Sequence, residues 1–205
     1  MPDLQTHDDE PNLISRSCEG DLDAFNVLVE RHQRPLYNLC LRMLGAREPA
    51  EDATQDAFIH AFRSIKTFHG GSFRAWLFRI GANACYDEMR RRRARPALSL
   101  DEPRGEGQPI DVRDPAPRLD EHVERLELAE LLKDALARLP SGQRLAIVLA
   151  DVHGFDYSEI AVAMECSLGT VKSRISRGRS QLRLILRAHG ELLPPRLRQV
   201  SEGQK

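Results

Sequence analysis

The chain has 205 residues and a formal net charge of only -1, which allows one large domain or two small ones. The near-neutral total argues against indiscriminate polyanion binding, although the charge is segregated into an acidic start and two later basic blocks. Four cysteines lie far apart without a CxxC pair, so we expect reduced, buried thiols rather than a zinc finger or a disulfide framework. No apolar run approaches a membrane span and no signal pattern is present, which predicts a soluble cytoplasmic protein without membrane insertion.

The first predicted elements are helical. Residues 1–20 are expected to form an acidic tail and a short helix, and Asp21 to cap a long helix whose apolar face continues to Met43. Pro35 lies within this helix and predicts a kink or break near Arg34. His32 lies on the apolar face and is expected to be a packed core residue, because no second metal ligand lies at useful spacing.

An acidic patch is predicted on the next helix, within residues 46–68. Pro49 is expected at its first position, where a missing amide costs nothing. Alanines at helical spacing predict one packing stripe, and a different side carries Glu51, Asp52, Gln55 and Asp56. Such a patch can be a solvated face. Paired carboxylates also suit acid/base catalysis, but no nucleophile, metal cluster or phosphate-cradling loop accompanies them. We therefore expect no enzyme, no cofactor, no metal and no small-molecule substrate.

Residues 57–86 contain no acid and most of the chain's aromatic side chains, interleaved with basic ones. Aromatic stripes are usually core, and Phe62, Trp76 and Leu77 are expected there at least in part. The loop 68–73 combines two glycines with aromatic and basic neighbours, a composition suited to holding unstacked bases. Ser72 is predicted to cap the following helix, which ends in an arginine cluster through Arg95.

Residues 96–118 are rich in proline, glycine and acids and are predicted to form a flexible linker. A helix with a leucine stripe that includes Leu132 is expected from 120 to 139, followed by another from 141 to 151.

A helix-turn-helix is predicted between 156 and 187. Ser158 is expected to cap the first helix, Glu165 and Cys166 to make the turn, and Ser167 to cap the second helix. The second helix keeps one face roughly apolar and is otherwise basic. A basic amphipathic helix alone is more often a solvated or partner-binding face. The preceding helix and the small polar N-terminal end favour entry into a DNA major groove.

Three runs in order carry a family resemblance: AEDATQDAFIHAF, GGSFRAWLFRIGANACYDEMRR and SEIAVAMECSLGTVKSRISRGRSQLR. Together they resemble bacterial sigma factors of the extracytoplasmic-function (ECF) group, over residues 21–95 and 121–186. Two positions depart from the family pattern. Glu165 stands where the family often has glycine, and Gly178 stands where it often has alanine. Gly178 costs about 1 kcal/mol of helix stability relative to alanine, which predicts fraying at the far end of the helix.

The resemblance implies an all-α fold with two small helical domains and a flexible linker, the second domain containing the helix-turn-helix. The expected divisions are 1–20, region 2 at 21–95, the linker at 96–118, region 4 at 119–188, and a tail at 189–205. The implied function is that of a non-catalytic subunit that directs RNA polymerase to promoters and assists melting. Its implied partners are core RNA polymerase, promoter DNA and an anti-sigma factor.

The resemblance also assigns roles to the candidate site residues. Polymerase binding is expected at Glu51, Asp52, Gln55 and Asp56. Contacts to the distal, duplex promoter element are expected at Ser167, Thr170, Lys172, Ser173, Arg174, Ser176 and Arg177. Contacts to the melted element are expected at Lys66, Phe68, His69, Ser72, Phe73, Arg74, Trp76, Arg79 and Asn83. The acidic linker is either a passive tether or a nucleic-acid mimic near the RNA path of the polymerase.

Two other functions fit part of the sequence. A homodimeric helix-turn-helix repressor would bind a palindromic duplex without polymerase. A helical RNA-binding protein would explain the aromatic and basic loop but would leave the helix-turn-helix without a role.

Overall fold

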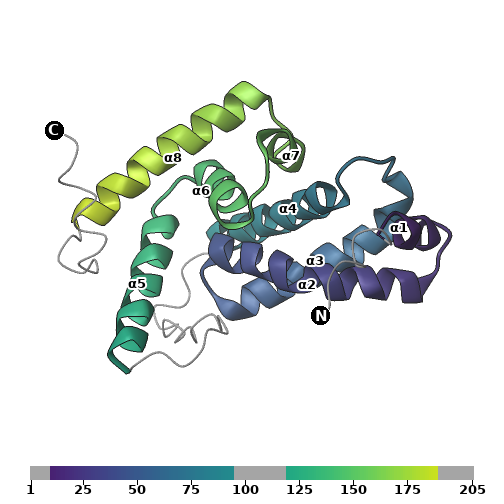
Figure 1. Ribbon diagram of the computed structural model, residues 1–205, viewed down its shortest axis with the longest axis horizontal. Helices are drawn as coiled ribbons and strands as arrows, with labels where there is room; N and C mark the ends of the chain where they lie inside the picture. The colour runs from purple at the N-terminus through teal and green to yellow at the C-terminus, as the bar shows by residue number, and fades with distance from the viewer. Residues whose placement is uncertain (1–9, 95–118, 189–205) are drawn as a thin grey trace.

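The computed structural model describes residues 10–94 and 119–188, and every regular element in these ranges is helical. The first part contains α1 (Glu10–Cys18), α2 (Leu22–Leu44), α3 (Arg47–Ser64), the 3₁₀ helix η1 (Ile65–Thr67) and α4 (Phe73–Ala94). The second contains α5 (Leu119–Ala137), α6 (Ser141–Ile147), the short π-helix η2 (Val148–Val152), α7 (Tyr157–Ala163) and α8 (Leu168–Ala188). Figure 1 shows this arrangement. The predicted all-α class with two helical domains is confirmed; the linker at 96–118 and the tail at 189–205 lie outside the described residues.

Helix α2 is bounded as its sequence predicts. The Asp21 carboxylate accepts hydrogen bonds from the amides of Asp23 and Ala24, and Gly45 ends the helix in the left-handed region at φ 72°. Of the kink or break predicted near Arg34, the break is wrong, because α2 runs without interruption through Pro35. The physical reason is tertiary packing: the helix buries leucines on both sides of the proline against α3 and α4, which outweighs the local penalty.

Helix α3 packs through small side chains. Ala50, Ala53, Ala57 and Ala61 are all buried between α2 and α4, as the sequence predicts. The helix begins at Arg47, so Pro49 is its third residue and not its first, which corrects that expectation. All amides of a first helical turn lack intrahelical acceptors, so proline is tolerated there as well.

In the second domain, α6 and α7 pack on α8. The first helix of the helix-turn-helix is capped by Asp156 and not by Ser158, since Asp156 and Glu159 form a reciprocal capping box. The predicted leucine stripe on α5 is also corrected at one position, because Leu132 is 37% exposed.

The far end of α8 does not fray at Gly178. This glycine is buried and lies against α6, where a Cβ atom would come within 2.6 Å of Ile147 Cδ1. The predicted fraying is therefore wrong: glycine at this position allows α8 and α6 to approach closely, and the packing outweighs its poor helix propensity.

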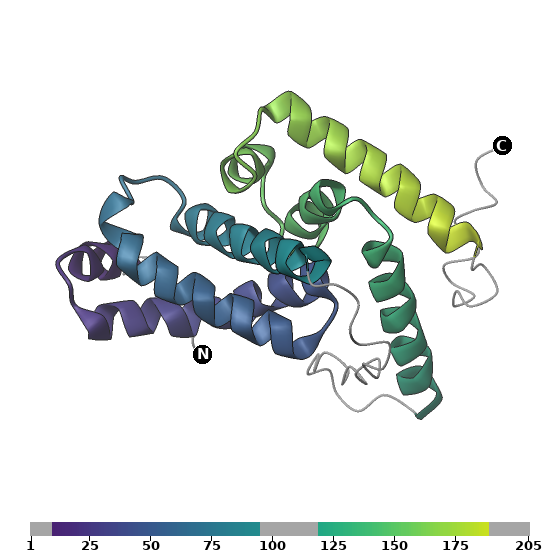
Figure 2. The same cartoon turned by 180° about the vertical axis from the view of Figure 1, so that it is seen from behind.

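The two helical parts pack against each other. Helix α7 lies beside α4 in both Figure 1 and Figure 2, and apolar residues of both parts form one continuous buried cluster. At this contact Phe78 of α4 lies 4.9 Å from Phe155, measured between ring centroids, and both rings are buried. Across the described ranges, no helix combines the length and apolarity needed to cross a membrane.

Candidate nucleic-acid and polymerase surfaces

The start of α8 is held by its own small polar residues. Ser167 caps the helix by accepting a hydrogen bond from the Thr170 amide at 3.2 Å, as predicted. The two hydroxyl oxygens lie 2.9 Å apart, and the Ser173 hydroxyl donates to the Thr170 carbonyl. These bonds order the end of the helix that is predicted to enter a DNA groove.

The predicted duplex contacts on α8 divide into outward and inward side chains. Lys172, Ser176 and Arg177 are exposed. Arg174 is half-buried: its guanidinium lies 3.7 Å from the Cys166 sulfur and packs beside Gly142 of α6. The outward group presents two cations and a hydroxyl on one helix, a combination suited to phosphates and base edges.

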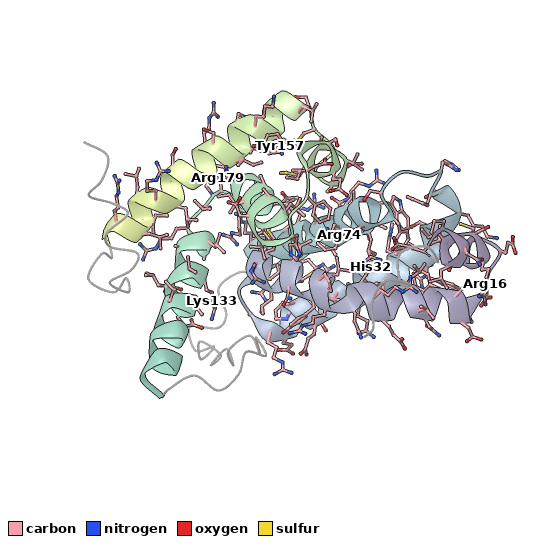
Figure 3. All side chains as sticks on the ribbon, in the orientation of Figure 1. Arg16, His32, Arg74, Lys133, Tyr157 and Arg179 are labelled. Carbon is pink, nitrogen blue, oxygen red and sulfur yellow. The ribbon has the colours of Figure 1, made fainter. Side chains whose placement is uncertain are left out.

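A separate arginine anchors α8 to the turn before α7. Arg179, labelled in Figure 3, forms a paired ion bridge with Asp151. It was not among the predicted DNA contacts, and here it joins α8 to η2.

The loop between η1 and α4 adopts the backbone path that its glycines permit. Gly70 and Gly71 have φ values of 101° and 90°, a region that other residues resist. Lys66 and His69 are exposed beside them. These two side chains are therefore available to a partner.

The aromatic members of the predicted melted-element site are mostly packed. Phe68 is half-buried and lies 5.6 Å from both Phe73 and Trp76 between ring centroids. Phe73 and Trp76 are only 4% and 6% exposed. Neither ring has a free face for a base in this structure. Both rings instead pack against Phe68 of the loop.

Three polar members of the same predicted site contact the second domain: Ser72, Arg74 and Arg79. The Ser72 hydroxyl caps α4 by accepting from the Ala75 amide, and it donates to a Glu159 carboxylate oxygen at 2.9 Å. Arg79 pairs with Glu165 at 3.1 Å. Asn83, the remaining polar member, is exposed farther along α4.

Arg74 makes the most extensive of these contacts. Figure 3 shows it between α4 and the second domain. Its guanidinium donates to the His153 carbonyl at 2.6 Å and lies 4.2 Å from the Phe155 ring centroid, a cation–π geometry. Burial lowers the pKa of Arg74 from its ordinary value, but an arginine stays charged at neutral pH.

His153 is the most perturbed titratable group at this contact. Its ring packs 5.0 Å from Phe78, and its Nε2 atom has no hydrogen-bond partner among the described residues. Burial, assisted by the charges of Arg42 and Arg74, lowers the pKa of His153 to about 4. The imidazole is therefore neutral at physiological pH.

The acidic patch of α3 lies opposite its alanine stripe. All four predicted polymerase contacts are exposed: Glu51, Asp52, Gln55 and Asp56. Arg47 pairs with Glu51 at 2.8 Å across one helical turn. The patch thus presents its carboxylates to solvent on a rigid helix.

Sequence reasoning missed the residues that join the two domains, chiefly Arg144, His153, Phe155 and Glu159. One signal was available: Phe155 is the only phenylalanine after Phe78. A phenylalanine directly before a helix-turn-helix favours a packing contact, although it does not identify the partner surface.

The chain matches two protein families in order. Residues 28–95 match Sigma-70 region 2, and residues 129–182 match Sigma-70 region 4. Two solved structures share the fold. One is CnrH in complex with the cytosolic domain of CnrY, with a TM-score of 0.66 and 29% identity over 87% of this chain and 97% of the other. The second is the sigma factor RpoE of Bartonella quintana in complex with the anti-sigma factor NepR, with a TM-score of 0.58 and 27% identity over 80% and 96%.

Two relatives define the family more narrowly. The ECF RNA polymerase sigma factor SigE of Mycolicibacterium smegmatis is 41% identical over 83% of this chain, and the match spans 65% of that relative. The ECF RNA polymerase sigma factor SigM of Mycobacterium tuberculosis is 35% identical over 86% of this chain and 84% of its own length. The predicted resemblance is confirmed, and the chain belongs to the ECF sigma factors of the sigma-70 family.

Proposed function

We propose that this sigma factor binds core RNA polymerase, directs it to specific promoters and assists their melting, with the work divided between its two domains. The proposed boundaries are 21–95 for the polymerase-binding and melting domain and 119–188 for the duplex-reading domain. The intervening 96–118 is proposed to act as the linker, with 1–20 and 189–205 as appendages. The chain needs no catalytic group of its own for this role.

The observation that carries the proposal is the placement of three surfaces on separate elements. Lys172, Ser176 and Arg177 project from α8, which suits a duplex element. Lys66 of η1 and His69 of the loop that follows are exposed before α4, which suits an unpaired strand. Asp52 and its neighbours project from α3 and suit a basic surface of the polymerase. A dimeric repressor would require only the first of these surfaces.

An anti-sigma factor is the proposed regulator, and the cytoplasm is the proposed compartment. The support comes from likeness: the Bartonella quintana relative was solved with an anti-sigma factor and shares the fold of this chain. The partner's identity would be found by co-purification from the source bacterium, followed by mass spectrometry of the captured protein.

A run-off transcription assay tests the proposal. Purified core polymerase is mixed with fragmented genomic DNA, with and without the chain, and new transcripts are mapped to their start sites. The expected result is a set of transcripts that require the chain and share two upstream elements. If the chain bound palindromic duplexes tightly and gave no polymerase-dependent transcript, the repressor alternative would replace this function.

A further inference from the structure

The polar face at the start of α4 is occupied by the second domain of the same chain. Ser72 donates to Glu159, Arg79 pairs with Glu165, and Arg74 donates to the His153 carbonyl. These contacts join residues separated by 79 to 87 positions in sequence. All three α4 side chains belong to the predicted melted-element site. The surface proposed to hold an unpaired strand is therefore covered by the domain proposed to read a duplex.

Two of the covering groups are carboxylates, and their chemistry resembles that of a nucleic-acid backbone. A carboxylate oxygen accepts hydrogen bonds from hydroxyls and guanidinium groups, as a phosphate oxygen does. Glu159 uses one oxygen to complete the capping box of α7, by accepting from the Asp156 amide, and the other to accept from Ser72. Glu165 offers its carboxylate to Arg79. An incoming strand would have to displace both.

The backbone at Glu165 adopts a left-handed conformation. Its φ is 48°, which makes it the only described residue other than glycine with positive φ. A glycine would adopt this turn without strain, whereas a glutamate carries a steric cost. Glu165, which carries this steric cost, is the residue whose carboxylate pairs with Arg79.

We propose that Glu159 and Glu165 act as an intramolecular mimic of the DNA backbone, so that the free chain occludes its own melted-strand surface. The occlusion ends when the two domains separate. The Arg79 and Glu165 side chains are 33% and 62% exposed, so their pair is weak and solvent-screened. The closed form also holds the buried Phe78–Phe155 contact. Its opening therefore requires polymerase to bind the separated domains more tightly and so to shift the population toward them.

Two carboxylate variants of the full chain test this inference. Glu165→Gly removes the charge and relieves the backbone, and Glu159→Gln keeps the capping box while removing the charge. The matched control is Glu130→Gln, which removes an exposed carboxylate of α5 that lies far from α4 in sequence and pairs with Lys133. Binding of a fluorescein-labelled, random-sequence single-stranded DNA is measured by anisotropy without polymerase, and small-angle scattering reports domain separation.

The double variant is expected to bind the oligonucleotide about fivefold to tenfold more tightly than the unaltered chain, with a larger radius of gyration. The control is expected to match the unaltered chain. Unchanged affinity and unchanged size in the double variant would overturn the inference. Larger size without tighter binding would also overturn it, because the carboxylates would then hold the domains without covering a DNA surface.

The inference rests on the proposed melted-strand role of α4, but the two fail differently. If the chain gave no polymerase-dependent transcripts in the run-off assay, the proposed function would fail whatever the variants did. If the unaltered chain directed transcription and the double variant showed neither change, only the occlusion would fail.

Discussion

The guanidinium of Arg144 donates a hydrogen bond to the backbone carbonyl of Met43, 101 residues earlier in the chain, at 2.5 Å. Arg144 is 8% exposed and belongs to α6, whereas Met43 lies in the last turn of α2. The same guanidinium donates to the carbonyls of Ala137 and Leu139. One buried cation thus joins the end of α5, α6 and the first domain, and no carboxylate among the described residues pairs with it.

Replacing Arg144 by methionine is expected to destabilise the protein. The apolar stem is largely kept, but three carbonyls lose their donor, and each buried acceptor left unpaired costs about 1 to 3 kcal/mol. Urea denaturation should show a lower midpoint than for the unaltered chain. Arg138→Met is the matched control, because Arg138 is exposed just before this contact. Equal midpoints for the two variants would contradict the role of Arg144.

Gly178→Ala should also destabilise, although alanine is the better helix former. The gain in propensity is about 1 kcal/mol, whereas overpacking in a close contact costs about 1 to 3 kcal/mol. The clash would be with Ile147 Cδ1 at 2.6 Å and with Ile147 Cγ1 at 3.2 Å. Because Ile147 is itself buried, its side chain has little room to move away. Ile147→Val removes the Cδ1 atom and should restore part of the loss. Gly169→Ala serves as the control, since its nearest neighbour would be the Ser167 hydroxyl at 3.8 Å. A rise in melting temperature for Gly178→Ala alone would show that propensity dominates.

The sequence predicted the elements and their local chemistry better than their long-range contacts. The caps at Asp21, Ser72 and Ser167 follow from short-range hydrogen bonding and were found where expected. Pro35 and Gly178 were misjudged because propensity describes an isolated helix, while packing on neighbouring helices decides both positions. The exposed patch on α3 followed from helical periodicity alone.

The contact between the domains could not be predicted in the same way. The melted-element candidates were chosen by composition, and composition does not separate Lys66, which is exposed, from Phe73, which is buried. Glu159 and Glu165 reach α4 only through the relative placement of two domains. No periodic pattern in the sequence encodes that placement. The contacts of Ser72 and Arg79 with the second domain could therefore be identified only from the structure.

Acidification should weaken the domain contact through His153. The pKa of His153 is lowered to about 4 in the folded chain, chiefly by burial, against an ordinary value of 6.5. The unfolded chain therefore binds more protons between these values, so stability is full above about pH 6.5 and falls as pH drops toward 4. The loss from this group is at most roughly 3 kcal/mol. His153→Phe keeps an aromatic ring and cannot titrate. Its unfolding free energy should vary less over this window, and an identical pH profile for both chains would contradict the assignment.

Charge reversal on the acidic patch should weaken polymerase binding without unfolding the chain. Asp52→Lys with Asp56→Lys changes two exposed side chains opposite the buried alanine stripe, so helicity and melting temperature should change little. Gel filtration with core polymerase measures the association. Asp23→Lys is the control, because Asp23 is an exposed acid of α2 outside the patch. Undiminished association of the double variant would remove the patch from the proposed polymerase surface.

Two exposed cations on α8 should separate base reading from backbone contact. Arg177→Ala is expected to cost about 1 to 3 kcal/mol on the cognate duplex and much less on a scrambled one, as the loss of a bidentate base contact would. Lys172→Ala should weaken both duplexes alike and reduce the slope of log affinity against log salt by about 1, as the loss of a phosphate contact would.

The control for both substitutions is Arg179→Ala. Arg179 is paired with Asp151 rather than directed at DNA, and the pair is exposed, so its loss should change stability by about 1 kcal/mol or less and leave sequence discrimination unchanged. Fluorescence anisotropy over a salt series, with promoter fragments identified by the run-off assay, measures all three variants. If Arg177→Ala weakened cognate and scrambled duplexes equally, Arg177 would be a backbone contact. Base reading by α8 would then have to come from other side chains at its exposed start, of which Ser176 is the nearest.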